Sequence, residues 1–169
     1  RKRPVIVSDP AVVRAAPNAA ATLNTFSELD NELQIKILRY LEGMGWLRSV
    51  KSHLPQTRIG QPVPWYTYSA TNILQRRLVP GLHVFEFGSG QSTLWWAERA
   101  EHVIAVEHNA RWYEEFRAKV PANVDYRLIK AVEDGDYARA AQASGHKFDV
   151  VVNDGRDRSN CAKFIVSTL

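Results

Sequence analysis

The sequence predicts an α/β fold, a three-layer sandwich in which helices cover both faces of a mainly parallel sheet. Two observations predict it. Four short apolar stretches, at residues 82–87, 102–107, 124–129 and 148–154, alternate with stretches of helical pattern. The stretch at 102–107 is apolar on both faces, as expected of a buried parallel strand. Strands and helices that alternate in this way form βαβ units, whose strands run parallel.

Length and composition are those of an ordinary soluble globular protein. The 169 residues suit one main domain, which we place at residues 64–169, preceded by an N-terminal arm and helical extension at residues 1–63. The net charge of +4 is modest, so a nucleic-acid partner is not favoured. No apolar run approaches the roughly 20 residues of a membrane span. The single cysteine, Cys161, is typical of a reducing compartment, and we expect a cytoplasmic protein.

The N-terminal extension is predicted to begin as a loosely ordered arm, residues 1–24, and to continue as a helix. Thr25 and Glu28 have the spacing of a capping box, with Thr25 as the N-cap. Apolar residues then recur at helical spacing, namely Leu29, Leu33, Ile37, Leu38 and Leu41. This stripe is expected to face a hydrophobic core, and Gly43 is expected to end the helix.

A second helix is predicted to begin at Pro64, since proline is favourable at a first helical position, and to end before Pro80. Trp65, Tyr66 and Tyr68 lie at its start. Two interpretations of these aromatic residues remain open. They pack the helix onto the sheet, or one of them lines a ligand pocket.

A sharp turn, Gly88-Ser89-Gly90, follows the first apolar stretch and leads into a helix at 92–100. Gly88 and Gly90 lack a Cβ, so they can adopt positive φ and let the backbone approach a ligand closely. Ser92 or Thr93 can cap the helix that follows. A strand that enters a helix through such a turn is where α/β proteins bind nucleotide-like ligands.

Three further helices are predicted along the chain. Asn109 is a suitable N-cap for the first, residues 136–143 form the second, and the third begins at Cys161. Right-handed crossovers between the strands then place the C-terminal end of every strand along one edge of the sheet.

Three carboxyl groups are predicted to meet at this edge. Glu86 comes just before the turn, and Glu107 and Asp154 end later strands. Glu107 lies 19 residues beyond Gly88 in the sequence. An acid at the end of the second strand, about 20 residues after such a turn, is placed to accept both hydroxyls of a ribose. The sequence therefore predicts a site for an adenosine-containing ligand.

Two such ligands are compared, a dinucleotide and S-adenosylmethionine. The dinucleotide fingerprint Gly-x-Gly-x-x-Gly has a third glycine, and here that position is Thr93. Glu86, two residues before Gly88, is an unfavourable neighbour for a pyrophosphate. The same carboxyl suits a ligand that carries an ammonium and a sulfonium, so the charges favour S-adenosylmethionine.

Three segments resemble motifs of class I S-adenosylmethionine-dependent methyltransferases. Residues 84–90, VFEFGSG, look like the first motif of that family. Val106-Glu107 is similar to its ribose-binding motif, and residues 148–155, FDVVVNDG, resemble the fourth-strand motif of its small-molecule branch. The resemblance covers the chain from about Trp65 onward. It implies a Rossmann-like sheet with the cofactor at its C-terminal edge.

The resemblance also implies roles for individual residues. The turn from Gly88 to Gly90 flanks the methionine part, Glu107 holds the ribose, and Glu133 or Asp134 meets the adenine amino group. His108, directly after Glu107, is taken as a turn residue rather than a base. The residues assigned to the cofactor are Glu86, Phe87, Gly88, Ser89, Gly90, Glu107, His108, Glu133 and Asp154.

Asp154 is the predicted catalytic residue, which orients the acceptor or serves as a base for a hydroxyl acceptor. Asp157 lies near it in sequence, but no further metal ligand is identifiable, so no metal site is assigned. The expected function is methyl transfer to a small molecule, at an oxygen atom. The alternatives are a nicotinamide-dependent oxidoreductase and a non-catalytic nucleotide-binding module.

The sequence also departs from the family. The family sheet usually has seven strands, and the strands after the fourth have no counterpart here. We expect either a fragment of a longer protein, or a homodimer or unusual edge that covers the exposed strand.

Overall fold

The computed structural model describes residues 5–7, 27–132 and 135–169. The chain forms two compact units, one of residues 1–9 with 63–169 and the other of residues 10–62. Within the described residues, no helix has the length and apolar character needed to cross a bilayer.

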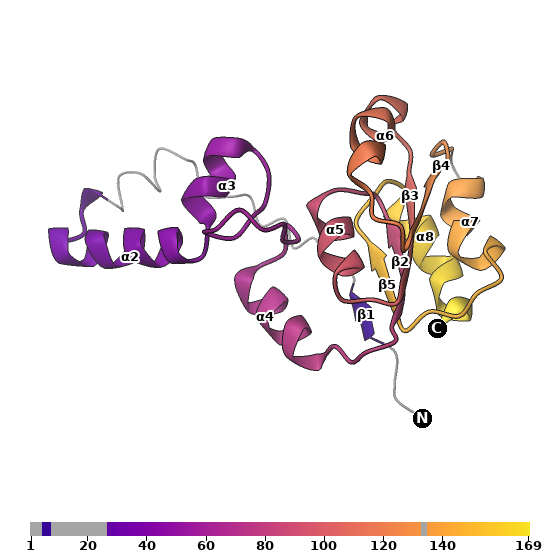
Figure 1. Cartoon of the computed structure of the whole chain (residues 1–169), viewed down its shortest axis with the longest axis horizontal. Helices are drawn as coiled ribbons and strands as arrows, with labels where there is room; N and C mark the ends of the chain where they lie inside the picture. The colour runs from indigo at the N-terminus through magenta and orange to yellow at the C-terminus, as the bar shows by residue number, and fades with distance from the viewer. Residues whose placement is uncertain (1–4, 8–26, 133–134) are drawn as a thin grey trace. The chain divides into compact units, whose positions relative to one another are not determined.

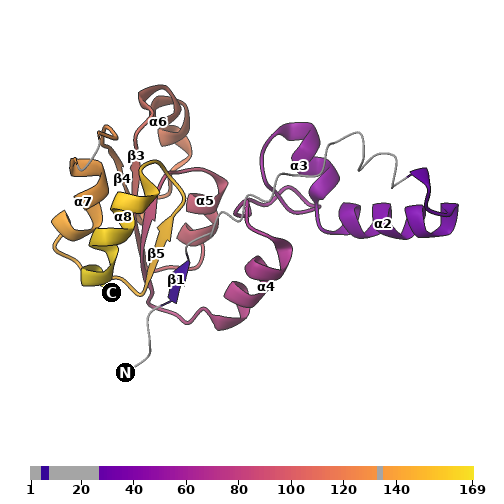
Figure 2. The ribbon, with the colours of Figure 1, turned by 180° about the vertical axis from the view of Figure 1, so that it is seen from behind.

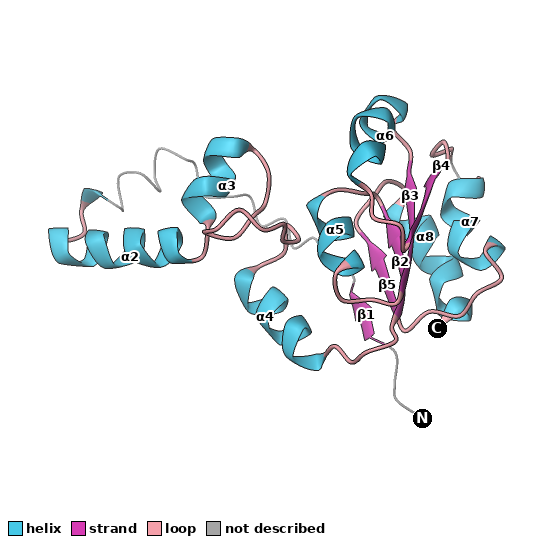
Figure 3. Cartoon of the chain, in the orientation of Figure 1, coloured by secondary structure: helices cyan, strands magenta, loops and turns pink. Residues whose placement is uncertain are grey.

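The larger unit is built on a five-stranded sheet in which each observed pairing is parallel. Its strand order is β1-β5-β2-β3-β4 (Figure 3). The strands are β1 (Val5–Val7), β2 (His83–Phe87), β3 (His102–Glu107), β4 (Val124–Leu128) and β5 (Val150–Asn153). The predicted α/β class and the four predicted strands, β2 to β5, are confirmed.

Helices cover both faces of this sheet (Figure 1). On one face lie α4 (Tyr68–Arg77), α5 (Gln91–Ala97) and α6 (Ala110–Phe116). On the other lie α7 (Asp136–Ala143) and α8 (Arg158–Ile165), which Figure 2 shows from behind. Short 3-10 turns, Arg117–Lys119 and Val166–Thr168, follow α6 and α8. The result is the Rossmann-like three-layer sandwich.

The alternation of side chains along the strands divides the core into two clusters. Phe85 and Phe87 of β2 pack with α7 and α8, whereas Val84 packs with α4 and α5. Trp95 and Trp96 of α5 are almost completely buried in the second cluster and meet edge to face, with ring centroids 4.8 Å apart. Both faces of β2 are therefore covered, which fixes the turn that follows it.

Strand β1 differs from the prediction of a loosely ordered arm. Val5, Ile6 and Val7 pair in parallel with Val150, Val151 and Val152 of β5. The N-terminal segment therefore covers the edge of β5 that the sequence analysis left exposed. Three apolar residues without a partner nearby in sequence are too short a signal to predict a strand.

Three helix starts also differ from prediction by more than one residue, and one of them is α8, which begins at Arg158 rather than Cys161. Helix α4 begins at Tyr68 rather than Pro64, because the hydroxyl of Thr67 accepts the Ala70 N–H as an N-cap. In the smaller unit, α2 (Asn31–Gly43) begins after Asp30, whose carboxylate accepts the Leu33 N–H at 2.8 Å. The predicted cap Thr25 lies outside the described residues. By contrast, Asn109 caps α6 as predicted, with its side-chain oxygen 3.1 Å from Trp112 N.

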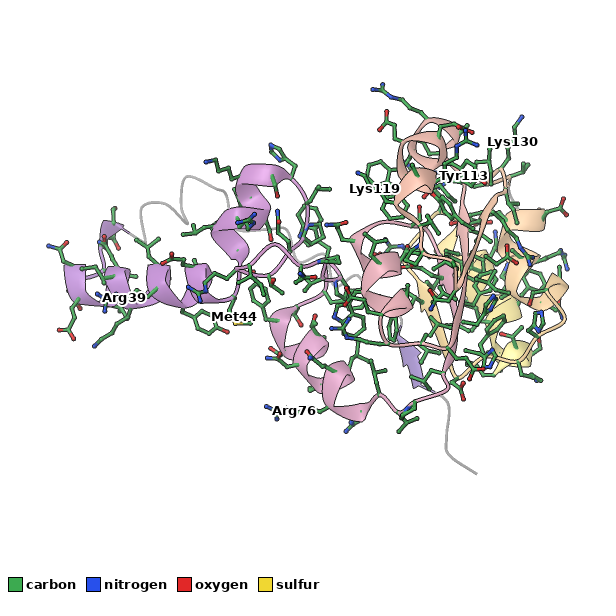
Figure 4. The ribbon with its side chains drawn as sticks, in the orientation of Figure 1. Arg39, Met44, Arg76, Tyr113, Lys119 and Lys130 are labelled. Atoms are coloured by element: carbon green, nitrogen blue, oxygen red, sulfur yellow. The ribbon has the colours of Figure 1, made fainter. Side chains whose placement is uncertain are left out.

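The smaller unit contains α2 and α3 (Trp46–Ser52). The apolar stripe of α2 was expected to face a core, and this expectation is wrong, since α2 has no buried residue and Leu33 and Leu38 are 41% and 43% exposed. Arg39 and Met44 are labelled on and just after this helix in Figure 4. A buried polar contact holds the loop after α3, where the Ser49 hydroxyl accepts from Gln56 N at 3.0 Å and donates to Gly45 O at 2.9 Å.

Candidate functional site

Glu86 and Glu107 lie on the same face of the sheet. Glu86 pairs in register with Ala105, which packs on the α4–α5 side, and Glu107 is two residues further along β3. Since side chains two apart on a strand share a face, both carboxyls point to the α4–α5 side. The sequence placed them at one edge, and the structure adds that they are neighbours on one face.

The turn after β2 requires a glycine at position 88. Gly88 has a φ of +91°, which L side chains rarely adopt, and its N–H donates to Val106 O at 2.9 Å. A Cβ at this position would lie 3.2 Å from Gly155 Cα and 3.3 Å from Asp154 O. The turn therefore lies directly against the loop that carries Asp154, as the sequence predicted for the shared edge.

Thr93 occupies the position of the third glycine of a dinucleotide fingerprint, and its hydroxyl forms two hydrogen bonds there. The Thr93 hydroxyl accepts the Gly90 N–H at 3.0 Å and donates to Glu86 Oε2 at 2.6 Å. Thr93 is fully buried. It ties the turn to the Glu86 carboxyl, and a glycine at this position would remove both hydrogen bonds.

Glu86 is a buried carboxyl without a cationic partner. Its residue is 1% exposed, and none of the described lysine, arginine or histidine side chains forms an ion pair with it. Burial raises the pKa of Glu86 to about 7, while the hydroxyls of Ser92 and Thr93 lower it and the charges of Asp154 and Glu107 raise it further. An ionised carboxyl in this place is stabilised most by a cation that comes from outside the protein.

Glu107 is held by the backbone. Its Oε1 accepts the N–H groups of His108 and Asn109, both at 2.8 Å, and its Oε2 accepts the Ser89 hydroxyl at 2.8 Å. The Ser89 oxygen also lies 2.8 Å from the Tyr126 hydroxyl. The carboxylate is therefore fixed in position with acceptor capacity left over, since its two oxygens offer about four lone-pair sites.

Aromatic rings surround this second carboxylate. Tyr113 of α6, labelled in Figure 4, stacks on Tyr126 with ring centroids 4.6 Å apart. The indole N–H of Trp112 donates to Ser89 O at 3.1 Å, which fixes the turn from the side of α6. Burial raises the pKa of Tyr126 to about 12.

Phe87 and His108 lie on the side of α7. Phe87 is fully buried in the core, so only its backbone borders the site. The His108 ring packs edge to face on Tyr137, with centroids 5.9 Å apart. His108 Nδ1 lies 3.0 Å from Glu107 Oε1, outside hydrogen-bond geometry.

Asp154 follows β5 and is accessible. Its side chain is 44% exposed and forms an ion pair with Arg158, whose Nη2 lies 2.7 Å from Asp154 Oδ1. Within the described residues, no three His, Cys, Asp or Glu side chains are grouped so as to hold a metal ion. Glu133 and Asp134, the candidates for the adenine amino group, lie outside the described residues.

Three aromatic residues near the site carry buried polar atoms without a hydrogen-bond partner among the described residues, namely Tyr66, Trp96 and Tyr137. Burial and the neighbouring charge of Glu86 raise the pKa of Tyr66, and the Trp96 indole lies close to its hydroxyl. From the sequence, Tyr66 was one of three aromatic residues, with Trp65 and Tyr68, expected either to pack the helix onto the sheet or to line a ligand pocket. The sequence analysis missed Trp96 and Tyr137, because aromatic residues at helical spacing are indistinguishable from core residues in a sequence.

Comparisons with known proteins agree with the fold. No protein-family model and no curated protein matches the chain. Among solved structures, the chain is similar to a methyltransferase-like protein from Silicibacter pomeroyi, with 22% identity and a TM-score of 0.50. The match covers 64% of this chain and 69% of that one. At this identity the likeness supports the Rossmann-like fold, and the function has to be argued from the site.

Proposed function

We propose that the protein is an S-adenosylmethionine-dependent methyltransferase that acts on an oxygen atom of a small-molecule acceptor. The observation that carries this proposal is the buried carboxyl of Glu86 beside the glycine turn, which accepts a hydrogen bond from Thr93 but has no cationic partner among the described residues. A cofactor with an ammonium and a sulfonium supplies the positive charge that this carboxyl lacks. A pyrophosphate would bring negative charge toward three carboxyls.

The residues present fit such a cofactor. Glu86 would accept from the ammonium group, and Glu107 would accept from the ribose hydroxyls while its backbone hydrogen bonds hold it in place. Gly88 and Gly90 would let the backbone approach the methionine part. When bound, the cofactor would supply an electrophilic methyl group, which passes in line to the acceptor oxygen as S-adenosylhomocysteine leaves.

Asp154 is the proposed base for the acceptor hydroxyl. Its carboxylate would take the hydroxyl proton as the oxygen attacks. The Arg158 guanidinium at 2.7 Å favours the ionised carboxylate, which is the form a base needs, but makes it a weaker base. Alignment of the two reactants then supplies most of the rate, as it can in a reaction that chiefly needs positioning.

Titration calorimetry with S-adenosylmethionine and with NADH tests the proposal. We expect binding of S-adenosylmethionine and none of NADH, and the reverse result would indicate an oxidoreductase. Production of S-adenosylhomocysteine across a panel of hydroxyl-bearing acceptors then tests catalysis. Cofactor binding with no turnover of any acceptor would favour a non-catalytic binding module.

A further inference from the structure

The side chain of Tyr137 contacts two segments that border the site, the end of β2 and the residue after β3. Tyr137 is in the first turn of α7 and is fully buried. Its ring contacts Phe87 edge to face at 5.5 Å, just before the glycine turn, and His108 at 5.9 Å, just after Glu107. One side chain from the opposite face of the sheet therefore touches the ends of both carboxylate-bearing strands.

Gly155 leaves the space that the Tyr137 hydroxyl occupies. A Cβ on Gly155 would overlap Tyr137 Oη and would lie 2.9 Å from Gly88 N and 3.0 Å from the carbonyl carbon of Phe87. Asp154 N also donates to Phe87 O at 3.2 Å. The hydroxyl is thus enclosed between the glycine turn, which faces the proposed cofactor, and the loop that carries Asp154.

This hydroxyl has no hydrogen-bond partner within the described part of the chain. The backbone of Arg156 and of Gly88 lies close to it, and burial raises the pKa of Tyr137. A buried hydroxyl without a partner destabilises a protein, and a phenylalanine would fill the same space without this cost. Such a group calls for an explanation, and a role in the site is one.

We infer that Tyr137 is a positioning residue that couples the cofactor turn to the acceptor loop. Its hydroxyl completes a hydrogen bond with the backbone of Arg156 when the two loops close on bound cofactor. The inference rests on the proposed function, because it needs a ligand at the glycine turn. It goes beyond that function by assigning a role to a side chain that touches neither reactant.

A double-mutant cycle in the full chain without ligand tests the geometry. We expect Gly155→Ala to lower Tm by roughly 3–10 °C, because the new methyl group overlaps the hydroxyl. Tyr137→Phe is expected to leave Tm unchanged or raise it by about 2–4 °C. The double variant should recover only the part of this loss that the hydroxyl causes, because the methyl group also lies 2.9 Å from Gly88 N and 3.0 Å from the carbonyl carbon of Phe87. A Gly155→Ala protein with the Tm of the wild type would overturn the inference.

Calorimetry with S-adenosylmethionine tests the coupling. We expect Tyr137→Phe to raise the Kd about 5- to 10-fold, which corresponds to the loss of one hydrogen bond. The control is Tyr40→Phe, which should leave the Kd unchanged because Tyr40 is an exposed residue of the smaller unit. Equal binding by wild type and Tyr137→Phe would overturn the inference alone. So would a Tyr137→Phe protein that is both less stable and weaker in binding, since the hydroxyl would then be purely structural. A wild-type protein that binds no S-adenosylmethionine would overturn the proposed function and this inference with it.

Discussion

Glu86 and Glu107 are buried carboxyls on one face of one sheet, at the ends of neighbouring strands, and their surroundings differ sharply. Glu86 is 1% exposed, receives the Thr93 hydroxyl, and has its pKa raised by burial to about 7. Glu107 is 4% exposed and accepts two backbone N–H groups and the hydroxyl of Ser89. The first carboxyl lacks a charge partner, and the second is held by hydrogen bonds.

The difference indicates which part of a ligand each carboxyl can recognise. A desolvated carboxyl gains most from a cation, because the cation restores the stabilisation that water would give. A carboxylate that the backbone already fixes needs no charge, and its remaining lone pairs are placed for hydroxyl donors. One ligand with a cationic end and a ribose satisfies both. Substitutions at the two carboxyls should therefore have different consequences.

Replacing Glu86 with glutamine should give the largest change in pH dependence. The folded-state pKa of about 7 lies above the ordinary glutamate pKa of 4.5, so the folded state holds a proton that the unfolded state has lost. The free energy of unfolding of the wild type should therefore fall as pH rises from about 4.5 to about 7. The shift corresponds to about 3 kcal/mol as an order of magnitude. Urea unfolding at several pH values measures the free energy of unfolding of wild type and Glu86→Gln. The difference between the two should change by this amount over the same pH range.

Glu101→Gln is the matched control, because Glu101 is exposed and precedes β3 at the opposite end of the strands. The free energy of unfolding of this variant should change with pH as that of the wild type does. If the stability of Glu86→Gln also changes with pH as that of the wild type does, the Glu86 carboxyl is not desolvated.

Replacing Glu107 with alanine should weaken S-adenosylmethionine binding by about 1–3 kcal/mol, because a ribose hydroxyl loses its acceptor. Calorimetry at constant pH measures this change. The slope of stability with pH between 4.5 and 7 should persist in this variant, since Glu86 causes it. Unchanged cofactor affinity would remove the assignment of Glu107 to the ribose.

Replacing Thr93 with valine tests the link between the turn and Glu86. Valine keeps the shape but loses the hydroxyl that joins Gly90 N to Glu86 Oε2, and we expect a loss of about 1–2 kcal/mol in the free energy of unfolding. Thr93→Ser keeps the hydroxyl and should retain most of the stability. Equal losses in both variants would show that packing, rather than the hydroxyl, explains this residue.

Replacing Ser89 with alanine should have the smallest effect. Glu107 keeps its two backbone hydrogen bonds, so the carboxylate should stay in place and cofactor affinity should change by less than about threefold. A loss as large as that of Glu107→Ala would mean that Ser89, and not the backbone, positions the carboxylate. Parallel calorimetry on the two variants makes this comparison.

The sequence was most informative where a pattern is local. Strands β2 to β5, the Asn109 cap and the placement of Glu86 and Glu107 at one edge follow from periodicity, capping chemistry and crossover handedness. The apolar stripe of α2 gave a wrong prediction of a buried face, because periodicity indicates that a helix has an apolar side but does not indicate what covers that side. Strand β1 and the contact of Tyr137 with Gly155 depend on residues distant in sequence. No local pattern contains that information.

Ionisation of Glu86 in response to a cationic ligand is the central requirement of the proposed function. Calorimetric titration with S-adenosylmethionine at pH 6, 7 and 8, in buffers of different ionisation enthalpy, measures the protons released on binding. We predict close to one proton released at pH 6, few at pH 8, and an affinity that rises across this range, with Glu86→Gln releasing none. Binding without proton release at pH 6, or equal release from Glu86→Gln, would contradict the account.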